Sequence, residues 1–96
     1  MQITYTGHGF DITPALKDFT AAKLVKLSRH SDHINRVNII FDIQNLDQIA
    51  EATIHLKGTE IFASASADDM YHAIEGLVSK LDKQLIKYKE KHTERR

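Results

Sequence analysis

The chain has 96 residues, of which 42% are hydrophobic, and it contains no cysteine. This length supports one small domain with a single modest core, and the missing cysteines exclude a disulfide framework and thiolate catalysis. The N-terminal sequence lacks the basic start and the apolar run of a signal peptide, and no stretch approaches the ~18 apolar residues of a membrane span. We therefore expect a soluble cytoplasmic protein without a membrane partner.

Charge is distributed unevenly along the chain, although 13 basic and 13 acidic residues give a net charge of zero. Residues 79–96 hold seven basic against three acidic residues, and residues 17–36 hold five against two. Residues 42–69 between them hold six acidic residues against one lysine. Because local fields rather than net charge create an anion-binding surface, neutrality does not exclude a nucleic-acid partner.

The N-terminal third predicts a strand followed by a helix. Residues 2–6 alternate apolar and polar side chains, which indicates a half-buried strand, and the segment Gly7-His8-Gly9 is expected to break it. Thr13 is a good N-cap and Pro14 suits the first helical position, so a helix is expected from there to about Arg29. Its expected apolar face consists of Leu16, Phe19, Ala22 and Leu27.

Lys23 lies close to that apolar face by the helix repeat. Its stem can pack while the amine reaches solvent. The alternative is a cation held at the edge of the docking surface for binding. Both interpretations remain open from the sequence.

Three further strands are predicted in the middle of the chain. Residues 37–44 alternate most clearly, residues 45–47 suit a turn, and residues 48–57 alternate again. Gly58-Thr59 suits a two-residue hairpin turn before a strand over residues 60–67. The small side chains of that last strand would allow a helix to approach the sheet closely.

A long helix is predicted over residues 69–96, capped by Ser66 or Asp68. Gly76 inside it costs about 1 kcal/mol relative to alanine, and a close helix–sheet contact is the simplest reason to tolerate it. An apolar stripe docks one face; it consists of Met70, Ile74, Leu77, Leu81, Leu85 and Tyr88. A second face carries Lys80, Lys83, Lys87 and Lys91. A solvated lysine-rich helix end would show the same pattern.

The element order β-α-β-β-β-α predicts a two-layer α+β domain. The first crossover is expected to be right-handed with parallel strands, and the other strand pairs are hairpins. Two amphipathic helices would then cover one face of a mixed four-stranded sheet, an arrangement like that of double-stranded-RNA-binding domains. We expect one domain over residues 1–91 and a frayed tail over residues 92–96.

No catalytic, metal or cofactor site is indicated. The six histidines are scattered, and no carboxylate cluster joins them at metal-ligand spacing. Phosphate loops, G-x-S-x-G and H-E-x-x-H are absent. An enzyme is therefore the minority hypothesis. The lysines of the two helices could instead converge on one patch that binds an RNA phosphate backbone, reading shape more than bases.

The sequence resembles the ribosome hibernation promoting factor family in its short bacterial form, which is closely related to the ribosome-associated inhibitor of translation. The resemblance rests on MQITYTG, DITPALKDF, AKLVKL, INRV and ATIHLKGTEIFASA, and it is densest in DMYHAIEGLVSKLDKQLIKYKEK. Each piece alone is weak, but their shared order covers nearly the whole chain. The short tail favours the hibernation factor over the inhibitor.

This resemblance implies a βαβββα fold and binding to the small ribosomal subunit near the decoding region, over the tRNA and mRNA sites. It implies 16S rRNA and idle ribosomes as partners, with stored ribosome dimers and a separate modulation factor, and no DNA. Basic positions that match the family are Lys17, Lys23, Lys26, Lys80, Lys83, Lys87 and Lys89. Arg29 and Lys91 fit the same surface by geometry. The alternative function is a protein-interaction module that docks through the acidic sheet region.

Overall fold

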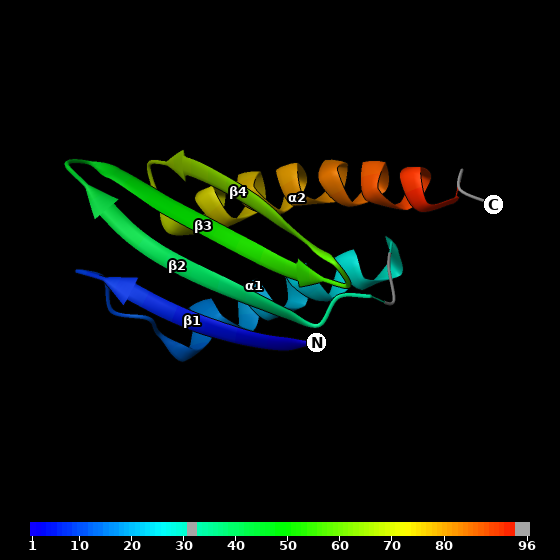
Figure 1. Cartoon of the computed structure of the whole chain (residues 1–96). Helices are drawn as coiled ribbons and strands as arrows, with labels where there is room; N and C mark the ends of the chain where they lie inside the picture. The colour runs from blue at the N-terminus through cyan, green and yellow to red at the C-terminus, as the bar shows by residue number, and fades with distance from the viewer. Residues whose placement is uncertain (31–32, 94–96) are drawn as a thin grey trace.

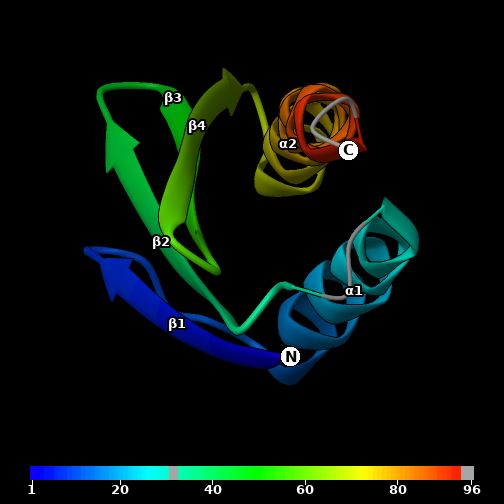
Figure 2. The same cartoon turned by 45° about the vertical axis from the view of Figure 1, so that its right-hand side comes forward.

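The structure, a computed structural model, describes residues 1–30 and 33–93. It has two layers: a four-stranded sheet, and two helices that lie on the same face of that sheet (Figures 1 and 2). This confirms the predicted α+β class and element order. The elements are β1 (Gln2–His8), α1 (Pro14–Val25), the 3₁₀ helix η1 (Lys26–His30), β2 (Arg36–Gln44), β3 (Asp47–Leu56), β4 (Thr59–Ala67) and α2 (Met70–Thr93).

The strands lie in the order β1-β2-β3-β4. β1 pairs with β2 in parallel, while β2 with β3 and β3 with β4 pair antiparallel, as the sequence predicted. The parallel pair requires a crossover, which α1 supplies. Both hairpin turns use positive-φ residues, Asn45 at φ 58° and Gly58 at φ 81°, which matches the preference for asparagine and glycine there.

The core lies between the sheet and the helices. α2 buries the predicted apolar stripe, and five of its six residues are nearly inaccessible to solvent while Tyr88 is partly buried. Burying each leucine of this stripe stabilises the fold by about 1.5–3 kcal/mol. The sheet contributes alternate residues such as Val37, Ile39 and Phe41 on β2, because successive side chains point to opposite faces.

The N-terminal strand is longer than predicted. β1 continues through Gly7 and His8, which pair with Phe41 and Asp42 of β2. A Cβ added at Gly7 would lie 2.3 Å from the carbonyl oxygen of Phe10. Gly7 is therefore required for close approach of the returning chain rather than for ending the strand. Of the predicted Gly7-His8-Gly9 break, only Gly9, whose φ is 63°, lies beyond the strand.

The first helix also differs from the prediction. Regular α-helix ends at Val25, and the chain continues as η1. Ala22 is exposed, and Leu24 is fully buried in its place. Thr20 is buried as well, and its hydroxyl donates to the carbonyl oxygen of Leu16 at 2.8 Å, so this polar side chain fits an apolar face. Thr13 caps the helix as expected, accepting from the Leu16 N–H at 3.1 Å.

The β3–β4 turn and the N-cap of α2 each lie one residue away from a predicted position. The β3–β4 turn consists of Lys57 and Gly58, since Thr59 already pairs with Leu56. The cap of α2 is Asp69, whose Oδ1 accepts from the His72 N–H at 3.0 Å, rather than Ser66 or Asp68. α2 extends through Thr93, and the rest of the predicted frayed tail, residues 94–96, lies outside the described residues.

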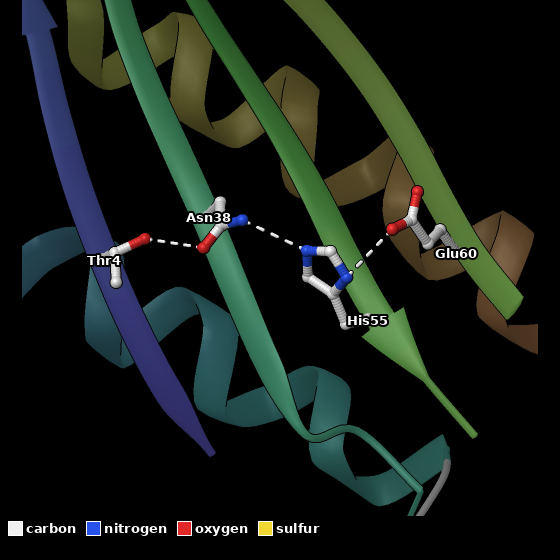
Figure 3. A network of polar contacts seen from close by, with 4 residues as sticks. All are labelled: Thr4, Asn38, His55 and Glu60. Atoms are coloured by element: carbon white, nitrogen blue, oxygen red, sulfur yellow. Dashed lines mark hydrogen bonds and ion pairs between the residues drawn. The ribbon is translucent and has the colours of Figure 1, made fainter. Parts of the chain in front are cut away.

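A chain of polar contacts crosses all four strands on the sheet face opposite the helices (Figure 3). The Thr4 hydroxyl donates to Asn38 Oδ1 at 2.7 Å, and Asn38 Nδ2 lies 3.1 Å from His55 Nε2. His55 Nδ1 lies 3.0 Å from a Glu60 carboxylate oxygen. A histidine that carries its proton on Nδ1 satisfies both neighbours, because Nε2 then accepts from the amide. The network links all four strands, from β1 to β4, on the sheet face opposite the helices, which we call the open face.

Candidate nucleic-acid interface

Basic side chains of the first helical segment line a groove between α1 and α2. Lys23, Lys26 and Arg29 contribute to this groove, whose volume is about 330 Å³. We call it the helix groove. The α2 side of it is lined by Glu75, Val78, Ser79 and Asp82. The helix groove is therefore a mixed surface, with three cations facing two carboxylates.

Lys23 combines the two interpretations left open by the sequence. Its Nζ lies 3.6 Å from a Glu75 carboxylate oxygen and 5.3 Å from the centre of the Phe19 ring. The side chain is 30% exposed, so the stem packs while the amine is held at the edge of the helix groove. Phe19 in turn makes an edge-to-face contact with Tyr71 of α2. This cluster joins the two helices, and it leaves the Lys23 amine within reach of solvent.

The lysines of α2 lie mainly on the opposite side of that helix, next to β4. Lys87 and Lys91 line a shallow pocket of about 450 Å³ with Thr59 and Ile61 of β4. Lys80 lies on the same side, and its Nζ donates to the carbonyl oxygen of Ser64 at 2.6 Å. We call Lys80, Lys87 and Lys91 the β4-side row. The helix repeat places Lys83 between this row and the helix groove, where it is exposed.

The contact made by Lys80 gives it a structural role. β4 is an edge strand, so its outer backbone groups lack a strand partner. Lys80 binds the Ser64 carbonyl oxygen, and Gln84 Nε2 donates to the carbonyl oxygen of Phe62 at 2.9 Å. Two α2 side chains thus cover the open edge of the sheet. The sequence pattern groups Lys80 with the binding lysines, because the sequence alone does not show that Lys80 lies next to an edge strand.

Lys17 and Lys89 lie apart from the β4-side row. Lys17 Nζ is 5.6 Å from the centre of the Tyr5 ring on β1, and the Tyr5 hydroxyl lies 3.3 Å from the Lys17 carbonyl oxygen. Burial, and then the charge of Asp18, raises the pKa of the Tyr5 hydroxyl. Lys89 falls on the α1-facing side of α2 by the helix repeat, the side that carries Val78 and Asp82.

The nine predicted residues therefore do not converge on one patch. The structure divides most of them between the helix groove and the β4-side row, with Lys83 on the crest between the two. Sequence reasoning missed Glu75 as a member of the helix groove. The helix repeat could have found it, because residues 75, 78 and 82 share the face turned toward α1. The role of the nine cations in RNA binding stays a prediction.

An acid–base pair marks the N-terminus of α2. The Asp69 carboxylate hydrogen-bonds both the backbone N–H and the ring Nδ1 of His72. The backbone and side-chain hydrogen bonds from His72 hold the pKa of Asp69 below its usual value, and the hydrogen bond and charge of Asp69 raise the pKa of His72. Both groups are exposed and belong to the helix cap.

Two classes of site are missing from the part of the chain that the structure describes. Within residues 1–30 and 33–93, no three histidine, cysteine or acidic side chains lie close enough to hold a metal ion. No helix in these ranges is both long and apolar enough to cross a membrane.

Comparison with known proteins agrees with this fold. Residues 3–93 match the family described as Sigma 54 modulation protein / S30EA ribosomal protein. The ribosome hibernation promoting factor of Klebsiella oxytoca is 50% identical over 91 residues, covering 95% of this chain and 96% of that protein. The protein of the same name from Azotobacter vinelandii is 47% identical over 95 residues, covering 99% of this chain and 89% of that protein.

Solved structures agree as well. A ribosomal subunit interface protein from Coxiella burnetii superposes with a TM-score of 0.85 at 43% identity, covering 94% of this chain and 99% of that one. The N-terminal domain of Protein Y from Thermus thermophilus superposes with a TM-score of 0.86 at 26% identity, covering 92% and 99%. The resemblance noted from the sequence motifs is thereby confirmed, and the chain belongs to the Sigma 54 modulation protein / S30EA ribosomal protein family.

Proposed function

We propose that this chain is a ribosome hibernation factor, a regulator without catalytic activity that binds the small ribosomal subunit near its decoding region. It would occupy the path of tRNA and mRNA and so keep idle ribosomes inactive. The curated relatives at 50% and 47% identity are named ribosome hibernation promoting factors, and the solved relative from Coxiella burnetii is named a ribosomal subunit interface protein. These names support a ribosomal partner.

The helix layer carries the proposal because it offers cations on two sides of α2. Lys23, Lys26 and Arg29 line the helix groove, and Lys87 and Lys91 line the pocket next to β4. Lysines act as point charges, so this surface suits phosphate oxygens more than bidentate reading of base edges. We infer that 16S rRNA is recognised through its shape and phosphate positions.

The two clusters differ in what surrounds the cations. Glu75 and Asp82 stand in the helix groove, whereas Lys83 is exposed on the crest and Lys87 faces only Glu90 among the acidic residues of its pocket. We therefore assign the dominant phosphate contacts to Lys83 and Lys87, with the helix groove contributing less per cation. Promotion of ribosome dimers, together with a separate modulation factor, is proposed as the consequence of this binding.

Charge reversal tests the proposal. Lys83→Glu and Lys87→Glu, alone and combined, are mixed with purified small subunits and pelleted. The combined variant should lose binding by more than about tenfold at low salt, because each reversal replaces an attraction with a repulsion. Arg36→Glu, at an exposed position on the opposite sheet face, is the matched control and should bind normally. Unchanged binding by the combined variant would contradict the assignment.

A further inference from the structure

The sheet face opposite the helices is left uncovered by the described residues. Both helices lie on the other side, as Figure 2 shows. Strand alternation decides which side chains lie here: Ile39 and Phe41 of β2 and Ala50 and Ala52 of β3 are buried under the helices. Their neighbours in sequence, on β2 and on β3, must therefore point to the open face.

Four of these neighbours form a checkerboard at the centre of the open face. Ile40 of β2 is paired with Glu51 of β3, and Asp42 of β2 is paired with Ile49 of β3. The two carboxylates thus occupy one diagonal of the square and the two isoleucines occupy the other. Residues on such a diagonal lie about 7–8 Å apart. All four side chains are half-buried.

The carboxylates of this checkerboard remain available. In the two described ranges, residues 1–30 and 33–93, the structure gives Glu51 no hydrogen bond or ion pair. Asp42 Oδ1 accepts from the Ile43 backbone N–H at 2.8 Å, and Asp42 Oδ2 accepts a long hydrogen bond from Gln44 Nε2 at 3.4 Å. These contacts orient the carboxylate, and each oxygen keeps a further lone pair for a guanidinium. Phe62 of β4 extends the carboxylate diagonal, because it is paired with Thr53, two residues beyond Glu51. Its side chain is 57% exposed.

We propose that this checkerboard docks an extended, arginine-bearing protein segment with the pattern Arg-x-Arg. In an extended chain, side chains two residues apart point the same way at a spacing of about 6.8 Å, which matches the separation of Glu51 and Asp42. The aliphatic stems would lie on Ile40 and Ile49, and the exposed Phe62 ring would accept a guanidinium face.

Other occupants fit this surface less well. The carboxylates repel phosphate, so the open face is unsuited to the RNA that the helix layer is proposed to bind. Two carboxylates alone are also a poor site for a divalent cation, and within residues 1–30 and 33–93 no three histidine, cysteine or acidic side chains lie close enough to hold one. The inference goes beyond the proposed function, and it is tested without ribosomes, so either can fail alone.

A short capped peptide with an Arg-Ser-Arg centre is the probe, and its isomer with an Arg-Arg-Ser centre is the spacing control. Binding to the whole chain is followed by ¹⁵N chemical-shift titration at low salt. The Arg-Ser-Arg peptide should bind more tightly than its isomer and shift amides of β2 and β3. Glu51→Gln and Asp42→Asn should each weaken binding about twofold to fivefold, the effect of losing one exposed ion pair. Asp18→Asn on α1 removes the same charge and should leave binding unchanged.

Three results would overturn the proposal. The first is no binding, and the second is equal affinity for the two isomers. The third is a loss of peptide affinity in Asp18→Asn as large as in Glu51→Gln, because the peptide would then respond to the net charge of the chain rather than to the checkerboard. Ile40→Ser and Phe62→Ser test the apolar contacts. Both substitutions should lower the affinity for the Arg-Ser-Arg peptide, and unchanged affinity in both would show that the peptide does not contact these side chains.

Discussion

Gly76 of α2 and Ala65 of β4 face each other across the contact between the helix and the sheet. A Cβ added to Gly76 would lie 3.4 Å from the Cβ of Ala65, which is an ordinary van der Waals contact distance. The sequence predicted this contact from two separate features, the small residues of the fourth strand and an unexplained glycine inside a long helix. Alanine fits the gap at ordinary contact distance, whereas a larger side chain does not.

Gly76→Ala should therefore raise the free energy of unfolding by up to about 1 kcal/mol, since helix propensity improves and no neighbour has to move. Gly76→Leu should lower it by about 1–3 kcal/mol, because the extra atoms have to displace β4. Urea unfolding followed by circular dichroism measures both. A destabilised alanine variant would show that the helix lies closer to the sheet than described.

The pair formed by Asp69 and His72 should make stability depend on pH. The pKa of Asp69 is lowered from 3.8, so its contribution is present above about pH 3.8 and is lost as pH falls through the folded value. The pKa of His72 is raised from 6.5, so its contribution is present below about pH 6.5 and is lost as pH rises through the folded value. The pair therefore stabilises the fold most between these two limits.

Asp69→Asn tests this relationship, because asparagine retains the N-cap and loses the charge. The difference in melting temperature between the native chain and the variant should be largest near pH 5 and should shrink above pH 7. In the same variant, an NMR titration of His72 should return its pKa toward the ordinary value. A difference that stays constant from pH 4 to pH 8 would assign the effect to the cap alone.

Lys80→Met should separate edge protection from RNA binding. Removing the hydrogen bond to Ser64 should lower the free energy of unfolding by about 1 kcal/mol and leave the β4 edge open to association with other chains. Subunit binding should fall less than in Lys83→Met, because the Lys80 amine is already engaged. Unfolding curves, sedimentation velocity and pelleting give the three readouts. Equal loss of binding in the two variants would place Lys80 among the phosphate contacts.

Glu75→Gln should tighten binding to small subunits about twofold to fivefold. The substitution releases Lys23 from its ion pair and removes a negative charge from the helix groove. Its effect on stability should stay below about 1 kcal/mol, because both partners of the pair are partly exposed. Asp47→Asn, at the start of β3, removes the same charge far along the sheet. If both variants tightened binding equally, the effect would be one of net charge.

Local sequence patterns predict most of the fold, because the patterns of the separate helices and strands are all compatible with one two-layer arrangement. Alternation in β2 and β3, the cap at Thr13 and the stripe on α2 all indicate the same two layers. The errors lie at element ends, where tertiary contacts decide. Gly7 looks like a strand breaker in the sequence, yet β1 continues because Gly7 and His8 pair with β2. Residue 7 is a glycine because a Cβ there would clash with the carbonyl oxygen of Phe10.

The arrangement of the cations was harder to predict than their identity. The sequence predicts that both lysine-bearing helices lie on one face of the sheet, which the structure confirms. It also predicts one lysine patch, but the structure divides the lysines between two sides of α2. The pattern could not show that β4 is an edge strand beside α2, nor that its carbonyls would engage Lys80 and Gln84. The helix repeat places Glu75 on the face turned toward α1, but it does not give the 3.6 Å separation that makes Glu75 and Lys23 an ion pair.

Co-sedimentation with purified small subunits over a salt series tests whether the helix layer binds small-subunit RNA through phosphate contacts. The chain should pellet with the subunits at low salt, and log affinity should fall linearly with log salt, with a slope of about −0.7 to −0.9 for each phosphate neutralised. The slope should become shallower by about two such steps in Lys83→Met/Lys87→Met. Absence of pelleting at low salt, or a slope unchanged in that variant, would show that these lysines do not neutralise RNA phosphates.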